Sequence, residues 1–498
     1  MGPLYCRFLT IFVVVMKRAS LTERIAKIPM AMVVIPFAMG IFFVDAFSIP
    51  MWILLLAIIV SLVGATLLSN WWQTLALFIL LGSTGALLHT ISYRDDVPYN
   101  TPLDISLKMA TSSASRGGYT SAEAEIVSCE DVSLVERKVI IWGDSLTRFC
   151  AGDRINIVKA VRPFRAEREQ YARLMHHRGF VGSVSIGRND LYEYIPTERA
   201  TLHDWAVARL QSTMEEGDSR AVVLAMATGE KREITPELRR SYSASGASHL
   251  LAVSGLHIGT AFMLINLLLL PFVLLRHGNI VRSVVAIVLI WLYVWLCGMS
   301  PSAVRAAIMF SLLQLSLLSL REYVGINILA GTAFAMLVFD THLLFDISFQ
   351  LSFIAVASIV LWSVPLYRRC ATRFKVANSI IGVMLVGIVS TIATMPLVAA
   401  TFSTVSIIGI LINPVVILLA NVVVLAGVVS LAIPPIAVIA EIAAKWQNCV
   451  VEWAATLPYG HFEVSLSEGA MWGVYTIFTV VSIVLFLLPP PQKSSKIE

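Results

Sequence analysis

Long apolar stretches separated by short polar segments dominate the pattern of this chain. Three of them follow a basic leader, at residues 29–44, 49–68 and 71–91. Because about 20 apolar residues cross the hydrocarbon core of a bilayer, residues 1–91 predict a leader and three transmembrane helices. Trp71 and Trp72 stand where an interfacial aromatic belt is expected.

The chain is again almost continuously apolar after His249. Eight further stretches have the length of a span: 256–275, 282–298, 303–320, 324–339, 347–364, 378–396, 408–433 and 470–488. Residues 434–457 are ambiguous, because charged residues interrupt their apolar character. We therefore expect a transmembrane domain at 248–488, about 11–12 spans in all, and a polar tail at 489–498.

Residues 92–199 carry no spanning stretch and predict a β domain. Segments 122–128, 132–142, 154–160, 180–186 and 191–195 favour strands, Gly143-Asp144 and Gly152-Asp153 favour turns, and 165–178 favours a helix. About five short strands with one helix between the third and fourth indicate an OB-like barrel. A generic small β domain is the alternative.

Residues 200–247 predict an amphipathic helical connector to the second membrane part. Thr235-Pro236-Glu237 is a strong helix start, with Thr235 as the N-cap and Pro236 in the first turn. The expected fold is thus a polytopic α-helical membrane protein with an inserted OB-like domain.

Composition supports this class, since 57% of the 498 residues are apolar and 14% are charged. A soluble protein has about 25% charged residues. Lipid must therefore be the solvent for much of the surface. The net charge of +5 is too small to identify a partner.

Basic residues set the expected orientation in a cytoplasmic, or inner, membrane. The leader holds Lys17, Arg18, Arg24 and Lys27, which predicts a cytoplasmic N-terminus and places residues 92–247 outside. A cluster at Arg368, Arg369, Arg373 and Lys375 then lies inside. The C-terminal tail is cytoplasmic as well if residues 434–457 cross the membrane.

Enzyme chemistry and cofactors are not indicated by the sequence. It contains no phosphate-binding glycine loop and no histidine or cysteine pair with metal-ligand spacing. Cys129 and Cys150 flank a predicted strand in the extracytoplasmic segment, where a disulfide is chemically allowed. We expect these two residues to form one.

Polar and helix-breaking residues at membrane depth are the candidate functional residues. Such groups face the interior of a bundle or a wet cavity, because lipid cannot satisfy them. They are Ser254, Gly255, His257, Arg305, Gln350 and Asn413. Close helix packing through small residues is the alternative interpretation.

The stretches that hold these residues resemble the ComEC competence family. They read HLLAVSGLHIG, GMSPSAVRAAIM and FDISFQLSF, and GEKREITPELRRSYSASGASHLL precedes the first. The resemblance implies a channel that passes one strand of DNA across the inner membrane. Many members also end in a metallo-β-lactamase-like domain, which this sequence lacks. We therefore expect a separate nuclease, motor or DNA-receiving protein.

A DNA conduit needs a receiving surface, and residues 162–178 of the β domain offer one. Basic side chains bind phosphates and aromatic faces stack on bases. The candidates are Arg162, Arg165, Arg168, Arg173, Arg178, Phe164 and Tyr171. Glu167 and Glu169 dilute the charge, so a solvated helix face is the alternative. A small-solute transporter and a non-conducting structural component are the alternative functions.

The orientation is testable by cysteine labelling. A membrane-impermeant maleimide added to intact cells should modify Arg188→Cys, which lies in the extracytoplasmic segment, and not Arg369→Cys, which lies in the basic cytoplasmic cluster. The reverse pattern would overturn the whole orientation.

Overall fold

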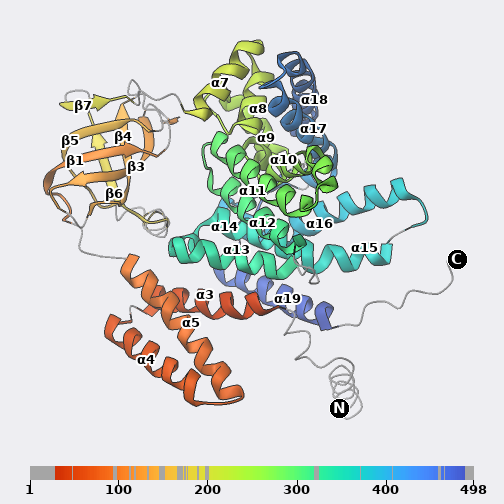
Figure 1. The fold of residues 1–498 in the computed structure, drawn as a ribbon. Helices are drawn as coiled ribbons and strands as arrows, with labels where there is room; N and C mark the ends of the chain where they lie inside the picture. The colour runs from red at the N-terminus through yellow and green to blue at the C-terminus, as the bar shows by residue number, and fades with distance from the viewer. Residues whose placement is uncertain are drawn as a thin grey trace. The chain divides into compact units, whose positions relative to one another are not determined.

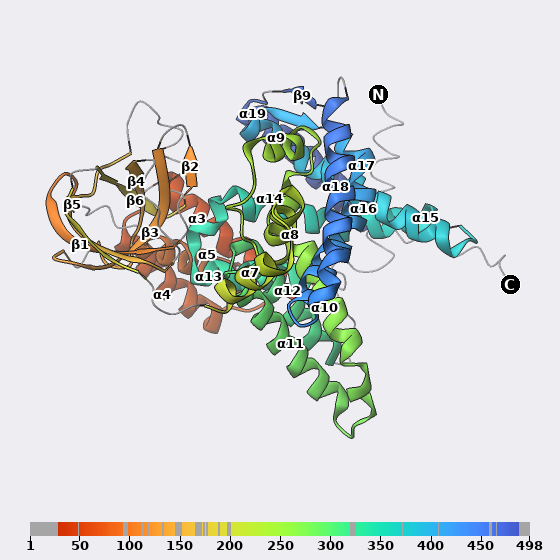
Figure 2. The same cartoon turned by 90° about the horizontal axis from the view of Figure 1, so that it is seen from above.

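The computed structural model of the protein divides into two compact units (Figures 1 and 2). Unit 2 comprises residues 33–201 and 334–349, and unit 1 comprises the chain up to residue 32, residues 202–333 and the chain from 350 onward. The structure describes residues 28–47, 49–92, 98–110, 114–116, 119–131, 134–144, 152–164, 172, 175, 178–187, 190–196, 201–318, 325–370, 372–406, 408–457, 461–464 and 466–487.

Unit 2 begins with the three predicted apolar helices, α3 (Pro29–Phe47), α4 (Met51–Leu67) and α5 (Trp71–Ser92). Glycines let α3 and α5 touch backbone to backbone. A Cβ on Gly40 of α3 would collide with the carbonyl oxygen of Gly82, and one on Gly85 of α5 with that of Phe37. Small residues at such crossings are typical of helix packing in membranes.

Seven strands follow in unit 2: β1 (Pro102–Met109), β2 (Ala114–Arg116), β3 (Tyr119–Cys129), β4 (Lys138–Asp144), β5 (Arg154–Ala160), β6 (Phe180–Ile186) and β7 (Tyr192–Ile195). The sheet order is β6-β4-β3-β1-β5-β7, with β2 paired to β3. All pairs are antiparallel except β4 and β6.

The sheet also closes on itself just after β5. Arg162 and Ser183 of β6 exchange both backbone hydrogen bonds, at 2.9 and 2.8 Å. Gly182 permits this approach, because a Cβ there would press on the carbonyl oxygen of Arg162. β1, β3, β4, β5 and β6 therefore form the partly open five-stranded barrel expected of an OB-like domain.

Strand prediction missed β1 and placed β4 too early. Residues 102–109 alternate between exposed and buried positions, but the predicted strands start at residue 122. With β1 included, the helix expected at 165–178 falls between the fourth and fifth barrel strands, β5 and β6, and not between the third and fourth. Most of residues 165–178 lie outside the described residues.

Unit 1 begins with α7 (Leu202–Thr213), α8 (Asp218–Ala227) and α9 (Pro236–Ala244). The predicted start of α9 is confirmed: the Thr235 hydroxyl accepts the N–H of Leu238 at 3.2 Å. The connector, however, belongs to the core, since residues 221–227 of α8 are all buried. The apolar side chains of α8 join one buried cluster with those of α10, α11, α12, α17 and α18.

The remaining elements match the predicted apolar stretches: α10 (Gly255–Leu268), α11 (Gly278–Leu296), α12 (Pro301–Leu318), α13 (Gly325–Phe339), α14 (Ile347–Ser358), α15 (Val364–Cys370), α16 (Lys375–Phe402), α17 (Ile408–Ser430), α18 (Ala437–Thr456) and α19 (Glu468–Leu487). Short 3-10 turns η3 (Ser248–Leu251), η4 (Leu270–Leu274), η5 (Thr341–Phe345) and η7 (Pro434–Ile436), a π-helical turn η6 (Ile359–Ser363) and a hairpin of β8 (Thr404–Ser406) with β9 (His461–Glu463) connect them. The described residues contain seven helices long and apolar enough to cross a membrane, and four shorter apolar helices.

The glycine crossing of α3 and α5 predicts a selective loss of stability. Gly40→Ala should lower the melting temperature of the purified protein, because overpacking a close contact costs roughly 1–3 kcal/mol. Gly387→Ala in α16 is the matched control, since a Cβ there meets nothing within 4 Å. Equal melting temperatures for the two variants would show that the crossing is loose.

Candidate functional site

The chain breaks its helical course between η3 and α10, at the predicted Ser-Gly position. Ala252 and Ser254 are extended, and α10 starts at Gly255 with Ser254 as its N-cap. The expected helix break is thus confirmed. Gly255 does not serve close packing, however, since a Cβ there would meet only the Cβ of Ala306, at 3.8 Å.

Arg305 lies level with this break because α10 and α12 run parallel. Gly255 faces Ala306, and a Cβ on Gly259 would lie 3.0 Å from the ring of Phe310. Both contacts advance by four residues in the same direction. This register sets Arg305 at about the level of Ser254. The Arg305 side chain is buried, with 2% of its surface exposed.

Asn413 lies on α17, at about the same level as the break before α10. The Thr260 hydroxyl donates to Oδ1 of Asn421 at 2.7 Å, and Gly409 packs on the carbonyl oxygen of Ser245, so α17 runs in the direction of α10. At about 1.5 Å per residue, Asn413 lies ~12 Å before Asn421 and Ser254 lies ~9 Å before Thr260. We name Ser254, His257, Arg305 and Asn413 the polar layer.

His257 has a defined tautomer in this layer. The Ser254 N–H donates to Nδ1 of His257 at 3.4 Å, so Nε2 carries the ring proton. His257 is fully buried, and among the described residues its Nε2 has no hydrogen-bond partner. A buried donor of this kind requires an acceptor from water or a ligand.

Three side-chain oxygens near the helix starts are also buried without a hydrogen-bond partner within the described part of the chain. They are Oγ of Ser254, Oγ of Ser300 and Oδ1 of Asn413. Ser300 precedes α12, and its carbonyl accepts the N–H of Val304. Sequence reasoning did not select Ser300, although its place before Pro301 is a helix-cap signal.

Gln350 lies on another helix, α14. It is half-buried on α14, and among the described residues α14 contributes none to the buried cluster that joins α10, α12 and α17. Asp346, which precedes it, caps α14 by accepting the N–H of Phe349 at 2.9 Å.

A charged cluster outside the membrane spans supports the start of α12. His203 of α7 donates from Nδ1 to the carbonyl of Leu296, at 2.8 Å, at the end of α11. Its Nε2 lies 3.8 Å from Glu230, which also accepts from Arg232 at 2.7 Å. Gly298 and Met299, both with positive φ, then turn the chain into α12.

This cluster shifts two pKa values in opposite directions. The hydrogen bond with Glu230 raises the pKa of His203, against the effect of burial. Burial raises the pKa of Glu230, but the hydrogen bonds from His203 and Arg232 outweigh it and hold that pKa well below its usual range. Both residues are therefore charged in the folded protein at mildly acidic pH.

In the β domain the predicted DNA-binding residues differ in availability. Arg162 is exposed, whereas Phe164 packs against Ile140, Met175 and Phe180. Arg178 pairs with Glu123 at 2.9 Å and lies 3.9 Å from Asp346. Outside the described residues lie Arg165, Arg168, Tyr171 and Arg173.

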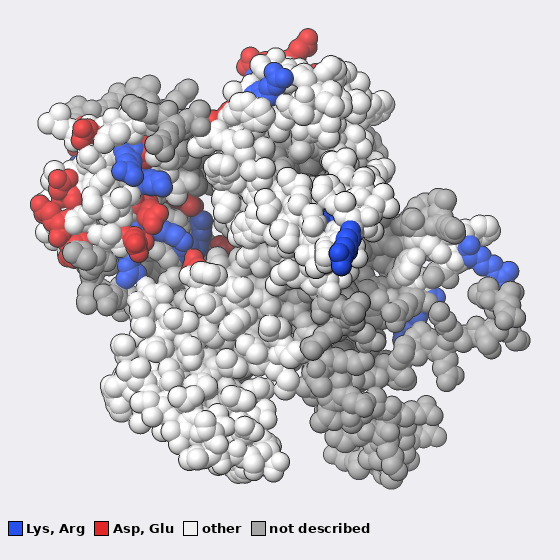
Figure 3. Space-filling view, viewed as in Figure 1, with Lys and Arg blue, Asp and Glu red and all other residues white. Residues whose placement is uncertain are grey.

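The charge of the β domain is balanced overall. Residues 92–199 contain 15 basic and 15 acidic side chains, and Figure 3 shows both signs interspersed over this domain. Any attraction for a polyanion must therefore be local. Cys129 is half-buried and Cys150 lies outside the described residues, so their disulfide stays a prediction.

The apolar helices and the inserted β domain define a multi-pass membrane protein with polar groups inside its helical bundle. The chain belongs to the Competence protein family, whose model matches residues 226–491. This confirms the resemblance seen in the sequence motifs.

Curated relatives match part of the chain as well. An uncharacterized protein of Aquifex aeolicus is 30% identical over 50% of this chain and 58% of its own length. Uncharacterized protein YcaI of Escherichia coli is 26% identical over 45% of this chain and 30% of its own length. ComE operon protein 3 of Bacillus subtilis is 29% identical over 39% and 24%. The chain thus spans less than two thirds of each relative, and no solved structure matches it.

The His203–Glu230 pair predicts a pH-dependent stability. His203, with its raised pKa, stabilises the fold fully below about pH 6.5 and loses that effect as the pH rises through its folded pKa. The melting temperature should therefore fall from pH 6.5 to 8. Glu230→Gln should make the melting temperature depend less on pH. It should also lower the free energy of unfolding by roughly 1–3 kcal/mol at pH 6.5. Glu237→Gln, on exposed α9 surface, is the control; a steep fall retained in Glu230→Gln would assign the pH effect elsewhere.

Proposed function

We propose that this chain is an inner-membrane channel component that passes single-stranded DNA into the cytoplasm during natural transformation. The observation that carries the proposal is the polar layer, where buried donors and a buried arginine meet the start of α10. Family membership and the likeness to ComE operon protein 3 support it.

The layer has the chemistry to accept a phosphodiester. The first N–H groups of α10 point out of the helix start, and the helix dipole is positive there. Nε2–H of His257 adds a neutral donor, and Arg305 adds charge. Neutral donors suit conduction, because a site of high positive charge would hold the polyanion instead of releasing it.

The β domain is proposed to receive the strand outside the membrane, with both chain termini in the cytoplasm. In OB-like barrels, ligands bind on the face of the second and third strands and on the loops beside it. Here β3 and β4 take those places, and residues 161–179 connect β5 to β6. The arginines predicted from the sequence fall within this segment of the chain.

Energy and strand degradation are assigned to partners. The sequence holds no nucleotide-binding motif, so a separate motor or DNA-binding protein must pull the strand. A separate nuclease would remove the other strand. Deleting the gene should leave labelled DNA bound at the cell surface and abolish its entry; normal entry after deletion would refute the proposal.

The polar layer is tested by a substitution that removes the N-cap hydroxyl of α10. Ser254→Ala removes a hydroxyl that faces the backbone N–H of His257, and loss of an N-cap costs about 1 kcal/mol of stability. DNA entry per folded molecule should drop further, by roughly tenfold for one lost contact of about 1.4 kcal/mol. His257→Ala should act alike, and His257→Gln, which keeps an N–H donor, should act less.

The matched control is Thr260→Ala, one turn further along α10. Its hydroxyl bonds to Asn421, so this variant should lose stability and keep normal entry per folded molecule. Abundance in membranes, melting temperature in detergent, surface binding and entry of labelled DNA are measured for all variants. If entry falls only in proportion to folded protein, the layer is structural.

A further inference from the structure

A G1 β-bulge shapes one end of the barrel between β1 and β5. The N–H of Gly152 donates to the carbonyl of Met109, and the N–H of Met109 donates to the carbonyl of Asp153, both at 2.8 Å. Gly152 has a φ of +95°, as the first residue of such a bulge requires. Bulges of this kind redirect the neighbouring side chains.

The next pair of residues in this ladder is Lys108 and Arg154, directly opposite each other. Because Met109 and Asp153 bond on one side of them, this is a non-hydrogen-bonded pair, whose Cα atoms lie about 4.5 Å apart. Both side chains are exposed on the outer face. Like charges in this position destabilise a sheet.

Neighbouring acids do not neutralise the two cations. The Tyr194 hydroxyl donates a hydrogen bond to the Asp153 carboxylate at 2.7 Å, and the Asn156 amide donates one to the Glu193 carboxylate at 2.9 Å. Glu125 lies opposite Lys108 on β3, but no ion pair joins them among the described residues. By contrast, Lys138, Lys159 and Arg178 of the same domain each have a carboxylate partner.

We infer that Lys108 and Arg154 form a phosphate-binding pair on the β domain for the backbone of single-stranded DNA. The inference rests on the proposed function and adds a contact to it. An anion between the side chains removes their repulsion, and an arginine fork beside a lysine point charge suits a phosphate. A membrane surface is the poorer ligand, because attraction to anionic lipid takes clusters of about 4–8 basic residues.

The test is the salt dependence of oligothymidine binding by the full chain in detergent. Lys108→Gln and Arg154→Gln should each reduce the slope of log affinity against log salt by about 0.7, the value for one phosphate contact on a single strand. Lys159→Gln removes the same charge from the same strand, but that lysine is paired with Asp190 at 2.8 Å. Its slope should equal that of the wild type.

Thermal melting provides a second measurement. Without DNA, either substitution relieves the repulsion, so the melting temperature at low salt should stay the same or rise. Added oligothymidine should raise the melting temperature of the variant less than that of the wild type.

The outcomes separate the two proposals. Wild-type binding with unchanged slopes in both variants refutes the pair and leaves the proposed function standing. Absence of binding by the wild type refutes the receiving role itself. Stabilisation of the wild type by short-chain phosphatidylglycerol and not by oligothymidine would make the pair a lipid site and overturn the inference.

Discussion

The start of α10 is the constraint on which unit 1 depends. A helix that begins inside a membrane protein exposes N–H groups that lipid cannot satisfy. The break at Ala252–Ser254 must therefore be enclosed by protein. Both α12 and α17 contact α10 and run parallel to it. Arg305 and the positive end of the α10 dipole lie at that level, which is why the proposed function gives the layer an anionic ligand.

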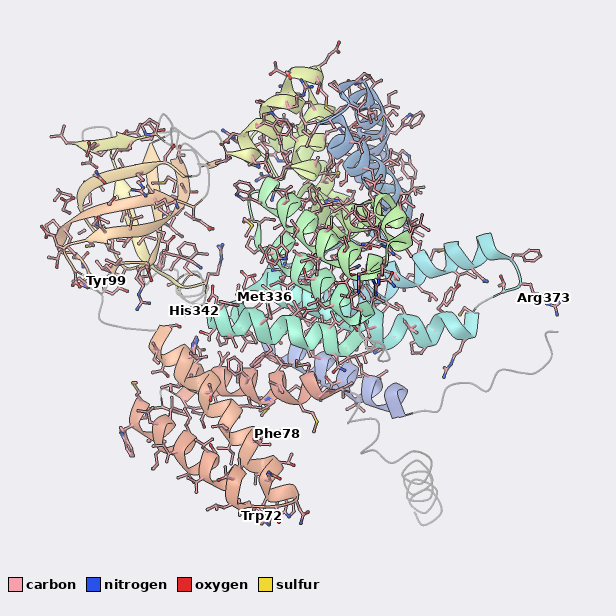
Figure 4. The ribbon with its side chains drawn as sticks, in the orientation of Figure 1. Trp72, Phe78, Tyr99, Met336, His342 and Arg373 are labelled. Carbon is pink, nitrogen blue, oxygen red and sulfur yellow. The ribbon has the colours of Figure 1, made fainter. Side chains whose placement is uncertain are left out.

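Ion pairs and hydrogen bonds outside the spans fix the positions of the surrounding elements. The His203–Glu230–Arg232 cluster fixes the turn before α12. In unit 2, the loop that joins α13 to α14 has a comparable role: Asp340 pairs with Lys138 at 3.5 Å, and Thr341 bonds to His89 of α5 at 2.9 Å. His342 (Figure 4) lies in that loop, and burial followed by the nearby His89 lowers its pKa to about 4. It is therefore neutral at physiological pH and joins these contacts without adding charge.

Local patterns in the sequence predicted the elements, and contacts between distant residues decided the rest. Every predicted span coincides with a helix, and the Thr235 cap is confirmed, because length, hydropathy and capping are properties of neighbouring residues. The burial of α8 was not predicted, since its apolar face meets Gly427 of α17, 200 positions after Ala227. The Lys108–Arg154 pair depends on a strand register that a bulge sets. The Arg178–Glu123 pair likewise joins the turn before β6 to β3, so a basic residue in a loop does not by itself predict an available charge.

The balanced charge of the β domain is consistent with a receiver that must also release. Each phosphate contact adds affinity that falls steeply with salt, so a uniformly basic barrel would retain a strand that has to move on. Pairing cations such as Lys138, Lys159 and Arg178 with carboxylates leaves fewer to meet phosphate, and a strand held by few contacts dissociates readily. The same reasoning applies to the polar layer, where one buried arginine accompanies neutral donors. Under the proposed function, a chain of weak, separate contacts would let an external motor draw the polyanion forward without any one site becoming a trap.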